Sequence, residues 1–590
     1  MTHNTAAKLA ALRAALARQG LGGFIVPRAD EHLGEYVPPS AERLAWLTGF
    51  TGSAGMAVVL AETAAVFTDG RYTLQLAAET DPACFERCHI TETPPPEWTA
   101  RNAPKGIHIG YDPRLIAAET LARFGAAGLT LRAVVANPID ALWTDRPAPP
   151  TAPAVPHPIR FAGRSAADKR ADIAAALARE GQDAAVLTDP AAIAWLLNLR
   201  GTDLEFVPVA LGFAIIDRTG RVQLFMAPAR LGAETRAALG NEVTPAPPAA
   251  LEGALRALSG RTVRIDPQTT PVWFAETLRA AGARVADGPD PCALPKALKN
   301  PTEQEGARAA HASDAVALIR FLHWLDGAAG ATTEAEAAAR LLALRAERPG
   351  FRGESFPAIS GAGEHGAIIH YRVTPDTDRP IRRNEVYLID SGAQFPEGTT
   401  DVTRTVWTGP GPAPAALRAH ATLVLKGHIA VATLVFPEGL TGVAIDAFAR
   451  RALWQAGLDY DHGTGHGVGS FLSVHEGPVS LSRLARPVPL AAGMILSDEP
   501  GFYLPGHYGI RLENLLLVQP ALPEAPRRFL GFETLTLAPF DRALIDPALL
   551  DGAERGWLDA YHARVLAAVG PALPEAARAW LARACAPLPG

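Results

Sequence analysis

The sequence predicts an α/β (α+β) chain in which two similar α/β domains in tandem precede a larger third domain. Three observations support this prediction: a repeat within the first 300 residues, a proline-rich connector between its copies, and helix-start signals near residue 301. At roughly 150 residues per domain, 590 residues suggest about four domains, and three larger ones fit equally well.

The repeat is a fixed order of helix, strand, tryptophan-containing segment and second strand. In the first copy these patterns occupy residues 9–16, 23–27, 44–50 and 57–60, and in the second copy residues 173–179, 184–187, 193–199 and 210–216. Trp46 and Trp195 are equivalent positions in the two copies. We therefore expect two related α/β domains, and we expect the first helix to belong to the fold rather than to a removable leader.

Prolines mark the boundary between the copies. Residues 147–158 hold six prolines in twelve residues, which is typical of a stiff, extended connector. We place the domains at residues 1–158, 159–300 and 301–590.

Capping signals predict how the third domain begins. Pro301 stops the preceding structure, and Thr302 with Glu305 predicts a capping box for a helix that ends near residue 327. Thr333 and Glu336 predict a second capping box and a second helix.

The composition is that of a globular protein. Hydrophobic residues make up 48% and charged residues 20% of the chain, and the formal net charge is −6 without any basic block. Nothing in the sequence therefore points to nucleic acid, and no apolar run is long enough for a membrane span. The four cysteines form no paired framework, which favours a reducing compartment and hence the cytoplasm: Cys84, Cys88, Cys292 and Cys585.

Residues 462–478 set three histidines, His462, His466 and His475, among closely spaced glycines. Glycine disfavours both helices and strands, so a segment this rich in glycine needs a reason other than stability. We interpret it as the wall of an active site. The alternative is a glycine loop that carries histidines incidentally.

Four acids in the same half of the chain complete a metal-binding pattern. Asp390 ends the strand-like run 386–390, and Asp401 follows the turn 395–398 on a predicted partner strand. With His466, Glu499 and Glu513 they supply four negative charges and one imidazole, which suits two divalent cations. An oxygen-dominated set without thiolates favours Mn²⁺ over structural zinc. Each acid alone could instead cap a turn or form a surface ion pair.

Several motifs resemble the Xaa-Pro aminopeptidase (aminopeptidase P) family in its long, three-domain cytosolic form. In the third domain they are residues 360–361, 366–371, 388–394, 398–405, 462–478, 497–501 and 557–562, and in the first two domains residues 43–55, 67–72 and 194–203. The resemblance thus extends over the whole chain and is far more specific than any one ligand spacing.

The resemblance implies two creatinase-like N-terminal domains, a pita-bread catalytic domain and a homodimer. It implies that two metal ions per chain, held by Asp390, Asp401, His466, Glu499 and Glu513, activate a bridging hydroxide, with Asp401 and Glu513 bridging. It also implies a proton shuttle at Glu499 and catalytic roles for His370 and His475. The implied substrate-binding residues are His370, His462, His475 and Arg511, the last of which should also orient a carboxylate.

These features predict removal of the N-terminal residue from peptides with proline in second position. Prolidase, which cleaves Xaa-Pro dipeptides, is the alternative with the same ligand set. A methionine aminopeptidase is disfavoured, because the two preceding domains have no place in it. A catalytically inactive peptide-binding member of the fold is a further alternative, although such proteins usually lose ligands.

Overall fold

The computed structural model describes residues 5–588, and two six-stranded sheets in its first half share one plan. The strand orders are β4-β3-β2-β1-β5-β6 and β12-β11-β10-β8-β13-β14. In each sheet three consecutive strands pair antiparallel, and the remaining neighbours pair parallel. The predicted tandem repeat of α/β folds is therefore confirmed.

The strands of both sheets are short. The first sheet contains β1 (Gly23–Pro27), β2 (Met56–Leu60), β3 (Ala64–Thr68), β4 (Glu86–His89), β5 (His108–Tyr111) and β6 (Thr130–Ala133). The second contains β8 (Ala184–Leu187), β10 (Phe213–Asp217), β11 (Val222–Phe225), β12 (Val243–Ala246), β13 (Thr262–Ile265) and β14 (Arg284–Asp287).

The repeat extends to one side-chain interaction. Helix α1 (Thr5–Arg18) places Lys8 4.8 Å from the ring of Trp46, and helix α8 (Ala166–Arg179) places Lys169 4.7 Å from the ring of Trp195. Each lysine also donates a hydrogen bond to the carbonyl of its tryptophan, at 2.8 and 3.1 Å. The tryptophans lie on the corresponding short helices α2 (Arg43–Thr48) and α9 (Pro190–Leu197).

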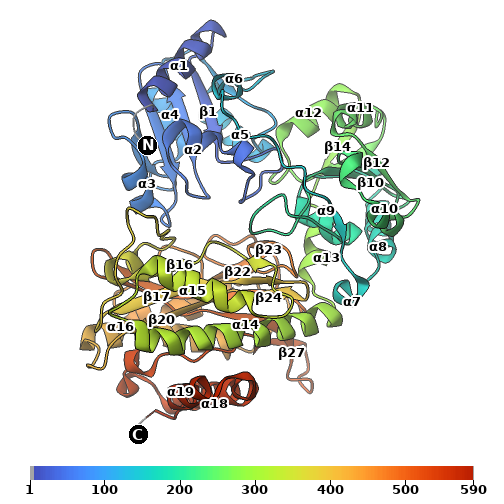
Figure 1. Cartoon of the computed structure of the whole chain (residues 1–590). Helices are drawn as coiled ribbons and strands as arrows, with labels where there is room; N and C mark the ends of the chain where they lie inside the picture. The colour runs from blue at the N-terminus through green and yellow to red at the C-terminus, as the bar shows by residue number, and fades with distance from the viewer. Residues whose placement is uncertain (1–4, 589–590) are drawn as a thin grey trace. The chain divides into compact units, whose positions relative to one another are not determined.

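The chain forms two compact units (Figure 1). One contains the residues up to Ile159 together with Arg164–Ala293, and the other contains Arg160–Gly163 and the residues from Leu294 onwards. Both six-stranded sheets of the repeat belong to the first unit. The predicted metal ligands all belong to the second.

Two sheets of the second unit contain or flank the predicted metal ligands. One sheet has the order β16-β17-β20, and the other has the order β21-β28-β27-β24-β22-β23. Their strands are β16 (Ile359–Ala362), β17 (Val386–Ser391), β20 (Val402–Trp407), β21 (Phe436–Pro437), β22 (Gly465–Gly467), β23 (Glu476–Leu481), β24 (Ile495–Asp498), β27 (Asn514–Ala521) and β28 (Phe529–Thr534). A separate hairpin pairs β25 (Gly501–Leu504) with β26 (Tyr508–Arg511).

Two helix pairs cover these sheets. Helices α14 (Pro301–Ala328) and α15 (Glu334–Ala346) pack on β16, β17 and β20 through one apolar cluster (Figure 1). Helices α16 (Ala415–Ala432) and α17 (Gly442–Gln455) pack on the larger sheet through another. Helices α18 (Gly552–Val569) and α19 (Glu575–Ala584) complete the core beside α16. This is the expected pita-bread arrangement.

One predicted helix cap is wrong and the other is confirmed. The side chain of Asn300 accepts hydrogen bonds from the backbone of Thr302 and Glu303, and Glu303 reciprocates, so the capping box begins two residues earlier than predicted. The reason is Pro301, whose fixed φ and missing N–H suit the first helical position. The box of Thr333 and Glu336 forms as predicted.

The predicted hairpin turn 395–398 joins β18 (Ala393–Phe395) to β19 (Gly398–Thr399) in a small separate sheet. Strand β20, the antiparallel partner of β17, starts only at Val402. Asp401 therefore lies just before the predicted partner strand rather than within it. The register places Asp390 opposite Thr403 of β20. Asp401 lies two residues before Thr403 in the chain, immediately before β20 begins.

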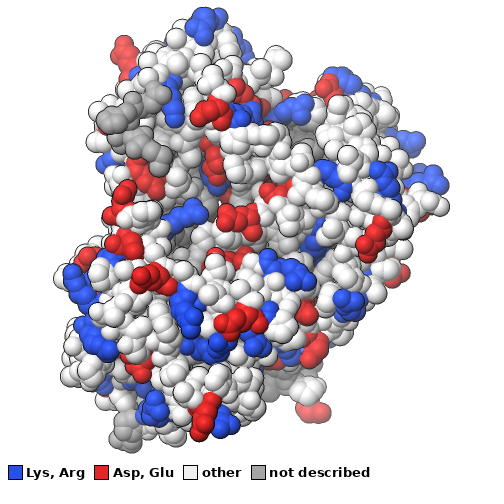
Figure 2. Space-filling model, viewed as in Figure 1, with Lys and Arg blue, Asp and Glu red and all other residues white. Residues whose placement is uncertain are grey.

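Charged residues of both signs are interspersed on the face drawn in Figure 2, in keeping with the small net charge. Within residues 5–588, no helix combines the length and apolar character needed to cross a bilayer.

Candidate metal centre

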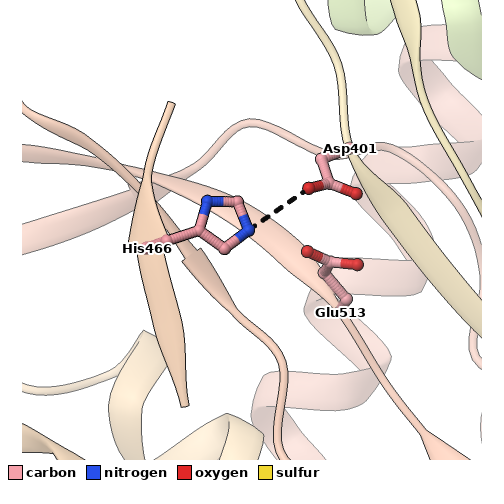
Figure 3. A group of neighbouring side chains, drawn as sticks. All are labelled: Asp401, His466 and Glu513. Carbon is pink, nitrogen blue, oxygen red and sulfur yellow. Dashed lines mark ion pairs between the residues drawn. The ribbon is translucent and has the colours of Figure 1, made fainter. Parts of the chain in front are cut away.

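Five predicted ligands converge from separate strands of the second unit. Asp390 is in β17, His466 is in β22, and the other three flank strand ends: Asp401, Glu499 and Glu513. Asp401, His466 and Glu513 each offer one ligand atom, and these atoms lie within 4.8 Å of one another. The three side chains point toward a common centre (Figure 3).

Short distances connect the remaining acids to this group. His466 Nε2 lies 3.5 Å from Asp401 Oδ2 and 3.4 Å from Glu499 Oε1. Asp390 and Glu513 both interact electrostatically with Asp401. The structure thus brings together all five residues that the sequence singled out, although their roles as ligands remain a prediction.

Burial and crowding shift the ionisation of these groups. Burial raises the pKa of Glu499 to about 6, and burial together with neighbouring carboxylates raises the pKa of Glu513 well above its usual value. Burial also raises the pKa of Asp390, although Arg511 opposes this shift. For His466, burial alone would lower the pKa, but Asp401 and Glu499 raise it to about 9. The acids therefore need positive charge to ionise together.

The donor chemistry fits divalent cations. Asp390 Oδ1 is buried and accepts no hydrogen bond among the described residues, which leaves it available to a cation. Four carboxylates and one imidazole, without any thiolate, are the ligands expected for Mn²⁺-like ions rather than for a structural zinc site.

The glycines of residues 462–478 allow backbone segments to approach closely. A Cβ atom at position 465 would lie 1.9 Å from the carbonyl oxygen of Ser497, and one at position 467 would lie 2.2 Å from that of Glu476. Any larger residue would push β22 away from its neighbours β23 and β24. The glycines thus place His466 beside the acids, as the interpretation of an active-site wall requires.

The predicted substrate residues are connected to the candidate ligands in different ways. The ring of His475 lies 4.2 Å from the ring of His466, nearly perpendicular to it. His462 Nε2 lies 2.9 Å from Tyr503 Oη. His370 is partly exposed and follows Ile369, whose carbonyl accepts a hydrogen bond from Arg511.

Arg511 is buried, with 2% of its surface exposed, and contacts one of the acids. It donates hydrogen bonds to Asp390 Oδ2 at 2.6 Å and to Tyr503 Oη at 2.7 Å. These contacts agree with the predicted orientation of a carboxylate.

Three supporting residues were missed by the sequence reasoning. Tyr503 links His462 to Arg511, and Thr403 donates a hydrogen bond to Glu513 Oε2 at 2.7 Å. Ser497 accepts a hydrogen bond from the backbone of His466 and donates one to Glu499. Strand alternation from Asp401 could have indicated Thr403, because residues two apart share a face.

Comparisons with known proteins define the class. The family model "Metallopeptidase family M24" matches residues 305–520, and "Creatinase/Prolidase N-terminal domain" models match residues 8–136 and 145–303. A model for the C-terminal region of the same peptidases matches residues 528–588. Fold and site together define a metallopeptidase of family M24 with two creatinase-type N-terminal domains.

Full-length relatives define the family within that class. "Probable Xaa-Pro aminopeptidase P" of Laccaria bicolor is 41% identical over 100% of this chain and 94% of its own length. The crystal structure of X-prolyl aminopeptidase from Caenorhabditis elegans, a cytosolic enzyme with a di-nuclear active site, has a TM-score of 0.94 at 33% identity. It covers 99% of this chain and 100% of its own. The chain belongs to the Xaa-Pro aminopeptidase P family.

A prolidase structure shares the fold over a smaller part of the chain. Xaa-Pro dipeptidase from Bacillus anthracis has a TM-score of 0.53 at 22% identity, covering 64% of this chain and 99% of its own. This likeness concerns the fold alone.

Proposed function

We propose that the protein is a metal-dependent aminopeptidase that releases the N-terminal residue from peptides with proline in second position. The observation that carries the proposal is the convergence of Asp401, His466 and Glu513 on one point, in a chain related over its full length to Xaa-Pro aminopeptidases. Elemental analysis of the purified protein, combined with a peptide-cleavage assay, tests it.

Two divalent ions would be held by Asp390, Asp401, His466, Glu499 and Glu513. When bound, such ions lower the pKa of water and polarise the scissile carbonyl. The oxygen-rich donor set supports Mn²⁺.

Glu499 is the proposed proton shuttle. It would take a proton from the attacking water and deliver it to the departing prolyl nitrogen. Its place supports this role, because Glu499 Oε1 lies 3.4 Å from His466 Nε2, among the other proposed ligands.

The histidines would act on the substrate. His370 and His475 would donate hydrogen bonds to the oxyanion of the tetrahedral intermediate, and His462 would line the substrate site. The perpendicular contact between His475 and His466 supports this placement, because it holds the His475 imidazole next to a candidate metal ligand. Arg511 would act mainly by orienting Asp390.

The full-length relatives support an aminopeptidase rather than a prolidase. The Laccaria bicolor relative named aminopeptidase P matches 100% of this chain, including both N-terminal domains. We divide the chain after residues 158 and 300 into two creatinase-like domains and the catalytic domain.

We also propose a cytoplasmic homodimer. Helix α17 exposes the apolar side chains of Val443 and Trp454, each more than 40% exposed and about three turns apart on one side of the helix, and a partner subunit would cover them. If this helix forms the interface, Trp454→Asp should convert a dimer into a monomer in analytical ultracentrifugation. An unchanged sedimentation coefficient would exclude this interface.

A further inference from the structure

Three charged side chains are buried together outside the proposed ligand set. Lys296 Nζ lies 2.8 Å from Glu476 Oε2, and Lys299 Nζ lies 2.5 Å from Glu476 Oε1. The side chains of all three are at most 5% exposed. Each carboxylate oxygen of Glu476 therefore has its own ammonium group, and this charge cluster holds the carboxylate on both sides.

Stability alone is a poor reason for such an arrangement. Removing two ammonium groups and one carboxylate from water is costly, and an apolar replacement of similar volume often stabilises a protein equally well. Burial by itself would raise the pKa of Glu476, yet the two lysines outweigh burial and lower it. The carboxylate of Glu476 thus stays charged. We therefore ask which neighbouring residues it holds in position.

Glu476 directly follows His475 and lies against the glycine-rich wall. It pairs with Gly467, the neighbour of His466, at a point where the register between β22 and β23 is interrupted. Strand pairing alone therefore does not fix this end of β23. Glu476 Oε2 would lie 3.1 Å from a Cβ atom at position 469, so the carboxylate also packs on the wall.

The lysines come from the segment that leads into the catalytic domain. Lys296 is in helix α13 (Ala293–Ala297), and Lys299 precedes the cap of α14. Both lie within the creatinase-type match to residues 145–303, whereas Glu476 lies within the metallopeptidase match to residues 305–520. The metallopeptidase region thus receives its counter-charges from outside its own boundaries.

We propose that the charge cluster is a positioning device, in which Lys296 and Lys299 hold Glu476 and thereby fix His475 against His466. The inference rests on the proposed function, because it assumes that His475 acts on the substrate. The connecting segment then serves the active site and is more than a linker between domains.

Kinetics of Glu476→Gln test this positioning. In Glu476→Gln an NH₂ group, which can only donate, replaces one carboxylate oxygen and faces an ammonium group, so His475 should lose its fixed position while every proposed ligand remains. We expect kcat for a Xaa-Pro-Yaa peptide to fall about 10–100-fold, with KM changed less than threefold and metal content unchanged. Glu476→Asp, which keeps the charge, should retain more activity than Glu476→Gln.

A matched control separates positioning from loss of an ion pair. Lys426→Met removes the partly buried pair of Lys426 with Glu554, 2.6 Å apart, on the helices α16 and α18. It should leave kcat unchanged. The proposal is overturned if Glu476→Gln keeps kcat within twofold, or if its kcat falls only in proportion to the folded, metal-loaded fraction.

Crystal structures of wild type and Glu476→Gln provide a readout that needs no activity. The two rings of His475 and His466, 4.2 Å apart, should separate or reorient in the variant. An unchanged ring geometry overturns the positioning role. If instead wild type cleaves no Xaa-Pro peptide while the rings still move, the proposed function fails and the positioning of His475 stands.

Discussion

Arg511 Nη2 donates a 2.6 Å hydrogen bond to Asp390 Oδ2, while the other oxygen of Asp390 has no partner among the described residues. One oxygen is thus fixed by a buried guanidinium and the other is left for a cation. A carboxylate with one oxygen held by a hydrogen bond and the other directed to the ion is typical of an oriented metal ligand.

Arg511→Met should therefore weaken metal binding. We expect the affinity for Mn²⁺ to fall about 10–100-fold, because Asp390 loses the donor that orients its carboxylate. Isothermal titration of metal-free protein measures this. Arg511→Lys is the matched control, because it keeps the positive charge but loses the planar guanidinium that donates to both Asp390 and Tyr503. Its Mn²⁺ affinity should lie between those of wild type and Arg511→Met. Equal affinities for all three proteins would contradict the assigned role.

Two substitutions separate proton transfer from metal binding. Glu499→Gln and Asp401→Asn should each lower kcat by about 10²–10⁴-fold, since one removes the shuttle and the other a bridging charge. Elemental analysis should show the larger metal loss in Asp401→Asn. His370→Ala should lower kcat with little metal loss. Near wild-type turnover of metal-loaded Glu499→Gln would rule out the proton-shuttle assignment.

Activity should depend on bound metal. Dialysis against a chelator should abolish cleavage, and added Mn²⁺ should restore it, because the attacking hydroxide is proposed to come from metal-activated water. Full activity in protein shown by elemental analysis to be free of metal would refute a metal mechanism.

The charge cluster should make stability depend on pH in the acid range. The folded-state pKa of Glu476 is lowered below its usual value of 4.5, so its stabilisation is complete above that value and is lost as the pH falls through the lower folded-state pKa. The difference in unfolding free energy between wild type and Glu476→Gln should thus shrink as the pH drops below about 4.5. Urea titrations at a series of pH values measure it, and a pH-independent difference would contradict the ion pairing.

Local patterns predicted most of the fold. The apolar spacing of α14 predicted an end near residue 327, and the helix ends at Ala328, because helical periodicity is a property of neighbouring residues. The start was misplaced because Asn300 and Thr302 both have side chains suited to capping. Only the position of Pro301 in the first turn decides between them.

The candidate ligands were predictable for a similar reason, since each lies in a short, specific motif. Their supporting partners were not. Glu476 and Lys296 are separated by 180 residues, and no periodicity connects them. Tyr503 adjoins Phe502 in β25, and strand alternation turns Phe502 into the apolar core and Tyr503 toward His462.

The most direct test of the central claim compares a Xaa-Pro-Yaa tripeptide with the matching Xaa-Pro dipeptide. Both need the same metal centre, so the comparison isolates the far end of the substrate. A prolidase must bind the free prolyl carboxylate, whereas an aminopeptidase must let the chain continue beyond proline. We predict a kcat/KM for the tripeptide well above that for the dipeptide, with cleavage largely abolished when alanine replaces proline. A clear preference for the dipeptide would contradict the account and identify the protein as a prolidase.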